Sequence, residues 1–175
     1  GEEIIEFCTP DHGWSVSVSQ WYETAVRCPE CSKEYKIQRF GKYFHRVSTA
    51  EIEAKEAQKQ KAYGMSKAIS KKAQEKGVTQ TLIDLLAEQP SIAATYRLLS
   101  SAELVHSSLG TFRKNWTGSQ SWVDQNSLGH NVTKIMSLLG IEDEELKSLH
   151  DEMELLLADA REAPTPMGEP VYTLK

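Results

Sequence analysis

The sequence predicts an α+β protein in which a small β module is followed by a long helix and an α-helical bundle domain. Three observations support this: short alternating or aromatic runs before residue 48, an Ala-, Lys-, Glu- and Gln-rich stretch after it, and apolar residues at helical spacing beyond residue 78. We expect four parts: the β module at 1–48, a basic helix or linker at 49–77, the helical domain at 78–163 and a flexible tail at 164–175.

The β module is predicted from four short segments. Residues 2–7 favour a strand, and residues 14–19 alternate apolar and polar side chains, as a half-buried strand does. Residues 33–40 and 42–47 read as two further strands, and Gly41 between them suits the turn of a β-hairpin. So few residues provide too little core to fold alone, and we expect an additional source of stability.

The helical part begins at a recognisable start signal. Ser48 and Thr49, followed by Glu51, are typical of a helix N-terminus, and the helix is expected to run to Lys76 and end at Gly77. Apolar residues at helical spacing then predict helices near 79–89, 92–110, 122–139 and 143–162. The tail contains three prolines and a glycine, a composition typical of disorder.

Charge is strongly segregated along the chain, although the net charge is only −5. Residues 1–32 carry a balance of −5, and residues 77–175 a balance of −7. Residues 33–76 between them contain twelve Lys or Arg and five Glu, a balance of +7. An anionic partner is therefore expected to bind the basic middle of the chain.

All three cysteines lie with one histidine in two short, turn-like clusters, and these four residues are the predicted metal ligands: Cys8, His12, Cys28 and Cys31. Structural Zn²⁺ takes four Cys or His ligands in tetrahedral geometry, usually as two close pairs separated by a loop. An odd number of cysteines favours metal-bound thiolates in a reducing compartment over disulfides. We therefore predict a Zn²⁺ site that staples the β module and supplies the missing folding energy.

Two alternatives to this ligand set stay open. Cys28 and Cys31 could be a redox pair, but a redox Cys-x-x-Cys normally opens a helix, whereas this one precedes strand-like residues. His45 on the predicted hairpin could replace His12 as the fourth ligand. His12 is favoured because Gly13 follows it, as in a zinc knuckle.

The Cys-Pro-Glu-Cys motif at residues 28–31, followed by Ser32 and by Tyr35 at the start of a strand, resembles the knuckles of zinc-ribbon proteins. Those knuckles read Cys-Pro-x-Cys-Gly and lie at the ends of β-hairpins. This chain departs from the pattern with Ser32 in place of Gly, and with one extra residue and a histidine in the first cluster. The resemblance covers residues 4–48 and implies a Cys3His zinc-ribbon-like module. It identifies no particular family, and none is recognised for the helical remainder. Four protein ligands would leave no open metal position, so the metal is expected to be structural.

The predicted hairpin combines basic and aromatic side chains, as single-stranded nucleic-acid sites do. An alternative is that the aromatic residues form the core of the module while the bases lie on its outer face. On the first interpretation, six residues contact nucleic acid: Lys33, Lys36, Arg39, Lys42, Tyr43 and Arg46. Four lysines extend the positive charge along the following helix: Lys67, Lys71, Lys72 and Lys76.

The sequence favours a non-enzymatic, zinc-binding regulator that contacts nucleic acid through the hairpin, with transcription or a phage or mobile element as its candidate setting. The alternative is a protein-binding adaptor or inhibitor, in which zinc is only structural and residues 78–175 dock a protein partner or self-associate. No phosphate loop, dinucleotide fingerprint, metalloprotease helix or catalytic triad is present, so we do not expect an enzyme. No apolar run approaches the roughly 18–20 residues that cross a bilayer, and no signal peptide is visible, so a cytoplasmic protein without a membrane partner is expected.

Overall fold

The computed structural model describes residues 3–9, 12–17, 26–28, 32, 34–126 and 128–173, with side chains placed for 27, 28, 32, 34–126 and 128–170. The fold is α+β, as predicted, with antiparallel strands and a helical bundle. The chain divides into two compact units. The first, here called the β unit, comprises residues 1–58 and 159–175, and the second, the helical unit, comprises residues 59–158.

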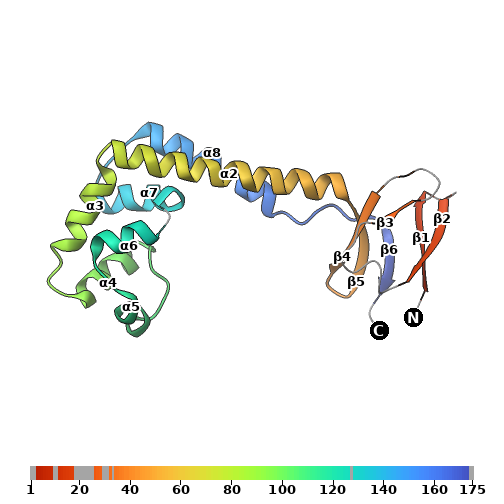
Figure 1. Cartoon of the computed structure of the whole chain (residues 1–175), viewed down its shortest axis with the longest axis horizontal. Coiled ribbons are helices and arrows are strands. Elements are labelled where there is room, and N and C mark those ends of the chain that lie inside the picture. The colour runs from red at the N-terminus through yellow and green to blue at the C-terminus, as the bar shows by residue number, and fades with distance from the viewer. Residues whose placement is uncertain are drawn as a thin grey trace. The chain divides into compact units, whose positions relative to one another are not determined.

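The β unit contains a four-stranded antiparallel sheet of order β3-β4-β5-β6 and a separate two-stranded hairpin, β1-β2 (Figure 1). Strand β1 approaches β6. The strands have these bounds: β1 Glu3–Thr9, β2 His12–Ser17, β3 Val26–Arg27, β4 Glu34–Phe40, β5 Tyr43–Ser48 and β6 Met167–Thr173.

The predicted hairpin is confirmed as β4 and β5, with ladder pairs from Phe40↔Tyr43 back to Tyr35↔Ser48. Its loop is the two residues Gly41 and Lys42, and Gly41 has a φ of +63°. A positive φ at the first loop position matches the twist of the flanking strands and is the conformation that glycine adopts without strain. The turn is therefore fixed by the one glycine between two β-favouring runs.

Four buried side chains are described on the β4–β5 hairpin. Tyr35, Ile37 and Phe44 are buried and share one face of the β4–β5 ladder, while Val47 is fully buried on the opposite face. Cys28, at the end of β3, is only 1% exposed. These side chains form the described part of the sheet's apolar core.

Strand β6 corrects the expectation of a flexible tail at 164–175, since Met167–Thr173 pairs with β5. Thr165, just before it, donates from its backbone N and its Oγ1 to Glu51 Oε1, at 2.9 and 3.2 Å. Pro170 lies where the register shifts, a position that needs no ladder N–H from it. Composition predicts disorder here, but the unpaired backbone edge of β5 offers hydrogen bonds that local sequence does not reveal.

The helices that follow have these bounds: α2 Thr49–Glu75, α3 Val78–Ala87, α4 Ile92–Ser101, α5 Leu109–Asn115, α6 Ser119–Gln125, α7 Leu128–Leu139 and α8 Glu144–Arg161. The start of α2 and its end before Gly77 agree with the prediction. The boundary between the two units falls inside α2, and residues 159–175 belong to the β unit. The segments expected at 49–77 and 164–175 are therefore not separate units.

Two predicted helices are interrupted in the structure. The helix expected at 92–110 ends at Ser101, where Glu103 turns the chain with a φ of +57°, and Ser108 then caps α5 by accepting from Thr111 N at 3.3 Å. The stripe expected at 122–139 is split into α6 and α7. Apolar spacing continued across the first break because Leu104 and Val105 in the loop also pack on the core.

The helical unit has one continuous apolar core, to which every one of its helices contributes. Its fully buried side chains include Ile69, Leu82, Leu99, Ile135 and Met153. Helices α2 and α7 approach so closely that Gly129 N donates to Ser70 Oγ at 2.8 Å. No helix in the described part of the chain is long and apolar enough to cross a membrane.

Candidate zinc knuckles and nucleic-acid interface

Two described features of the segment between β3 and β4 are compatible with a zinc knuckle. The pair Arg27↔Glu34 closes it, reinforced by an ion pair between the two side chains at 2.9 Å. Inside the turn, Ser32 N donates to Cys28 O at 2.9 Å, and Ser32 has a φ of +59°. A left-handed residue is usually glycine, so Ser32 adopts here the conformation that favours the knuckle glycine.

The first predicted cluster lies at the end of the β1–β2 hairpin. Thr9 pairs with His12 and Phe7 pairs with Gly13, so Cys8 sits at the register shift between them. A bulge re-aims the side chain of its extra residue. The backbone therefore brings Cys8 and His12 to one hairpin end, as a pair of ligands from one knuckle requires.

Of the four predicted ligands, only Cys28 has a described side chain, and Cys31 lies outside the described residues. Among the side chains that are described, no group of three His, Cys, Asp or Glu could hold a metal ion. Because only Cys28 of the four predicted ligands has a described side chain, this result does not test the predicted ligand set. The Zn²⁺ site therefore stays a prediction, and the left-handed Ser32 and the register shift at Cys8 are compatible with it.

The strand register argues against His45 as the fourth ligand. His45 pairs with Gln38, four residues along β4 from Glu34, which corresponds to about 13 Å at the usual strand rise. Zn²⁺ bonds of about 2.0–2.3 Å cannot bridge that separation to Cys28, which lies beyond Glu34. His45 instead places Nδ1 3.3 Å from Gly168 O, and its ring contacts Phe40 at 5.5 Å between centroids.

The six predicted nucleic-acid contacts do not share one face of the hairpin. Lys36 and Tyr43 lie on one face of the ladder and Arg39 and Arg46 on the other, because alternate residues of a strand point to opposite sides. Lys42 is in the turn, and Lys33 lies outside the described residues.

Three of these residues gather at the tip of the hairpin. Tyr43 is 40% exposed, and the Lys42 ammonium lies 5.3 Å from the centroid of its ring. Arg39 is exposed and donates from Nε to Gly41 O at 2.6 Å, which holds its side chain against the turn. We call Arg39, Lys42 and Tyr43 the hairpin tip. It places the Tyr43 ring beside one cation, Lys42, while Arg39 lies on the opposite face at the same end of the hairpin. An aromatic ring beside a cation is a combination that binds an unstacked base and its phosphate.

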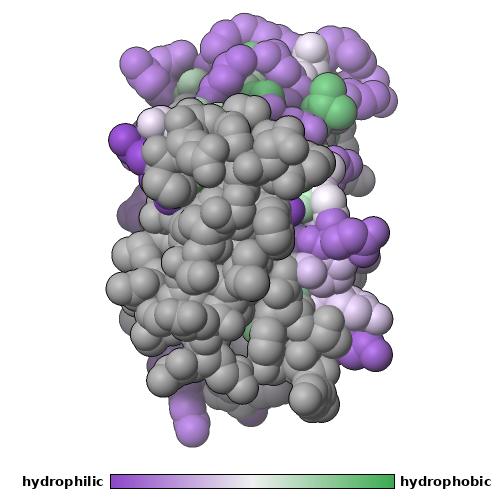
Figure 2. All heavy atoms as spheres, turned by 90° about the vertical axis from the view of Figure 1, so that its right-hand side faces the viewer, coloured by the Kyte–Doolittle hydropathy of each residue, from purple (hydrophilic) through white to green (hydrophobic). Residues whose placement is uncertain are grey.

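Arg46 lies apart from the tip. It is half-buried, and a Cβ placed on Gly168 of β6 would come within 3.6 Å of its guanidinium. The core alternative holds for Tyr35 and Phe44, which are buried. Elsewhere, on the face seen in Figure 2, the described residues are mostly hydrophilic.

The lysines of α2 fall into two groups. Lys72 and Lys76 pair with the start of α8: Lys72 with Glu145, and Lys76 with Asp143 and Glu145 at 2.8 and 2.7 Å. Hydrogen bonding to Asp143 and Glu145 raises the pKa of Lys76, and the bonds from Lys76 and Lys72 lower the pKa values of Asp143 and Glu145, respectively. These two lysines are therefore occupied within the helical unit.

The other two predicted α2 lysines, Lys67 and Lys71, are exposed, and Lys71 is only 3.9 Å from Glu75 on the same helix. Sequence reasoning did not anticipate the α2–α8 ion network. The run of acids at 142–145 was the signal that could have predicted it. Acids at the start of a helix interact favourably with the helix dipole, and they can also pair with basic side chains of a neighbouring helix.

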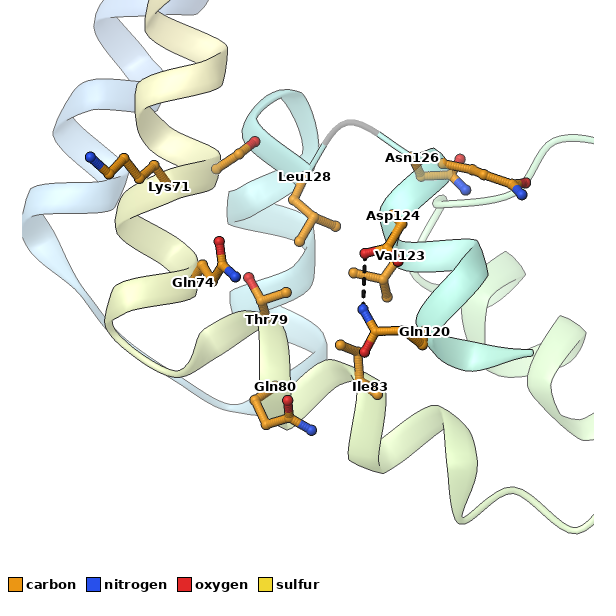
Figure 3. Close-up of a pocket in the computed structure, with 12 residues that line it drawn as sticks. Lys71, Gln74, Thr79, Gln80, Ile83, Gln120, Val123, Asp124, Asn126 and Leu128 are labelled. Atoms are coloured by element: carbon orange, nitrogen blue, oxygen red, sulfur yellow. Dashed lines mark hydrogen bonds between the residues drawn. The ribbon is translucent and has the colours of Figure 1, made fainter. Parts of the chain in front are cut away.

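A polar groove of about 680 Å³ lies in the helical unit between the ends of α2 and α6 (Figure 3). Its floor includes Ile83, Val123 and Leu128, and five carboxamides lie around it: Gln74, Gln80, Gln120, Gln125 and Asn126. Asp124 accepts from Gln120 Nε2 at 2.9 Å, as the dashed line in Figure 3 marks. The groove therefore gathers hydrogen-bonding side chains around an apolar floor.

No family model, curated protein or solved structure matches this chain. Its function must therefore be inferred from its own residues.

Proposed function

We propose that the protein is a zinc-stapled, non-enzymatic regulator that contacts single-stranded nucleic acid through the hairpin tip. The observation that carries this proposal is the exposed Tyr43 ring with the Lys42 ammonium 5.3 Å from its centroid and Arg39 on the same turn. Every base can stack on an aromatic face, and the neighbouring cations pair with phosphates. The tip therefore suits binding with little sequence preference.

The proposed role of Zn²⁺ is to hold the two hairpin turns together through Cys8, His12, Cys28 and Cys31. The left-handed Ser32 and the Cys8 bulge support this assignment. A closed four-ligand site supplies folding energy and does no chemistry of its own. The metal would thus act on binding only by fixing the strands from which the tip projects.

Metal content tests the zinc part directly. Native mass spectrometry of the full chain should find one Zn²⁺ per protein, lost in Cys28→Ser and in His12→Ala. His45→Ala is the matched control and should retain the metal, because the register keeps His45 about 13 Å away. A metal-free wild type, or loss of metal in His45→Ala only, would contradict the ligand set.

Fluorescence anisotropy with labelled single- and double-stranded oligonucleotides across a salt series tests the nucleic-acid part. Tyr43→Ala should weaken single-strand binding by about 5- to 150-fold, the effect of losing one stacked base. Lys42→Ala should reduce the salt slope by about 0.7, the value for a cation that neutralises one phosphate of a single strand. Lys147→Ala, an exposed lysine of α8, is the control and should bind as wild type does. Absence of salt-dependent binding would overturn the proposal in favour of a protein-binding role.

A further inference from the structure

Helices α2 and α8 lie side by side along one side of the helical unit and run antiparallel (Figure 1). The buried residues of both helices belong to the common apolar core, so the opposite side of each helix faces outward. Lys72 pairs with Glu145, which sets the level of one helix against the other. Because both helices rise about 1.5 Å per residue, Leu155 of α8 then lies level with Ala62 of α2.

Leu155 is the most exposed of the large hydrophobic residues in the described part of the chain, at 74%. It lies on the outward side of α8, one turn beyond Asp151 and on the opposite side of the helix from the fully buried Met153. Single exposed leucines are common on protein surfaces, so the surroundings of Leu155 decide whether it marks a contact. Two features of the neighbouring surface, its charge and its shape, indicate that it does.

The outward sides of the two helices carry opposite charge. On α8, Leu155 is accompanied by three exposed acids: Glu144, Asp151 and Glu152. On α2, three lysines are exposed: Lys61, Lys67 and Lys71. One opposite charge lies on each helix, Lys147 and Glu75, and leaves α8 net acidic and α2 net basic on this side. Within the described side chains, neither Lys61 nor Lys67 has an ion pair.

The outward side of α2 also has a recess close to the level of Leu155. Gly64 is exposed, and a Cβ placed on it would meet nothing within 4 Å. Gly64 is two residues beyond Ala62, which is about 3 Å along the helix axis. A side chain from another helix can therefore reach the α2 backbone at this point, between the lysines.

We propose that this outward face of α2 and α8 pairs with the same face of a second copy of the chain. A two-fold axis parallel to the helix pair places α2 of each copy over α8 of the other without changing their levels. Leu155 of one copy then enters the recess at Gly64 of the other, and Asp151 approaches Lys67. The charges select this occupant, because a second copy presents a basic ridge to the acidic one and an acidic ridge to the basic one. The inference goes beyond the proposed function and does not depend on it.

Sedimentation velocity of the full chain over a concentration series tests the pairing. The wild type should form a dimer whose dissociation constant rises with salt, since its ion pairs are exposed. Leu155→Ser should weaken the dimer by about 10- to 150-fold for each leucine removed from the interface. Ile92→Ser is the matched control, because Ile92 is an exposed hydrophobic residue of α4. It should dimerise as the wild type does.

Charge reversal tests which helices meet. Lys67→Glu should weaken the dimer by about 2- to 30-fold, because its exposed ion pair with Asp151 occurs twice in a two-fold interface. Asp151→Lys should weaken it by a similar factor. The chain that carries both changes restores opposite charges at both places, so it should dimerise within about 2-fold of the wild type. This rescue would not follow from a general loss of folding.

Each other result overturns the inference. A wild type that stays monomeric at every concentration leaves the two ridges to another protein or to solvent. A dimer that Leu155→Ser does not weaken is held together by another surface. A dimer that both single charge variants weaken, but that the double variant does not rescue, rules out the exchange of α2 and α8 between copies. None of these results bears on the hairpin tip, whose oligonucleotide binding is measured separately.

Discussion

Gly129→Ala is expected to destabilise the helical unit strongly, although alanine normally favours a helix over glycine. A Cβ at residue 129 would lie 2.6 Å from Ser66 Oγ and 2.7 Å from Ser66 C, and closer still to the Ser66 carbonyl oxygen. That oxygen belongs to the backbone of α2 and cannot move aside as a flexible side chain could. Helix α7 must therefore shift away from α2, which also strains the 2.8 Å bond from Gly129 N to Ser70 Oγ.

The size of the effect follows from these contacts. Overpacking a tight interface costs about 1–3 kcal/mol or more, and a lost buried hydrogen bond about 1 kcal/mol. The higher helix propensity of alanine offsets this loss of folding stability by about 1 kcal/mol. We expect a net loss of about 1–3 kcal/mol, and each kcal/mol corresponds to a fall of about 4–8 °C in the melting temperature of a domain of roughly 100 residues.

Gly64→Ala on α2 is the matched control, because a Cβ there meets nothing within 4 Å. This substitution should stabilise the helical unit by about 0.5–1 kcal/mol, because alanine lowers the conformational entropy of the unfolded chain and favours the helix more than glycine does. Both variants are compared with wild type by circular dichroism at 222 nm during thermal and urea unfolding. If Gly129→Ala melts at or above the wild-type temperature, the close approach of α7 to α2 is wrong.

Two further predictions concern charge and the C-terminal strand. Because lysine partners lower the pKa values of Asp143 and Glu145, their ion pairs stabilise the fold above about pH 4, and this stabilisation is lost as the pH falls through the lowered values. The melting temperature of the wild type should therefore fall as the pH is lowered below about 4. Its dependence on pH should be weaker in Lys76→Met and the same as wild type in Lys71→Met. Equal slopes of melting temperature against pH in all three proteins would argue against the network. Deleting residues 164–175 should remove hydrogen-exchange protection from β5 while the α7 amides stay protected, and an undisturbed β5 would mean that β6 contributes nothing.

Local signals predicted much of the fold. Gly41 between two β-favouring runs located the β4–β5 hairpin, and Ser48 with Gly77 bounded α2 closely. In each case, the deciding residue lies within a few positions of the feature that it determines. Such features need no knowledge of the rest of the chain.

What the sequence could not predict depends on contacts between distant residues. The tail looked disordered because its prolines and glycine disfavour regular structure, yet it becomes β6 through the edge of β5. Leu104 and Val105 fit a helical pattern but pack on the core from a loop, after Glu103 has turned the chain. At the candidate site, Lys72 and Lys76 looked like free positive charge, and only the position of α8 revealed their acidic partners.

The small sheet also explains why a structural metal and a distant strand would occur together. Its two edges are β3, which is only two residues long, and β6, which comes from the far end of the chain. The proposed Zn²⁺ would hold the β3 edge through the turn that contains Cys28, while β6 covers the edge of β5. Since the two supports act on opposite edges of one cooperative sheet, loss of either should expose the same few buried side chains. Chelating the metal from the chain that lacks residues 164–175 should therefore add little further unfolding of β4 and β5, a non-additivity that independent modules would not show.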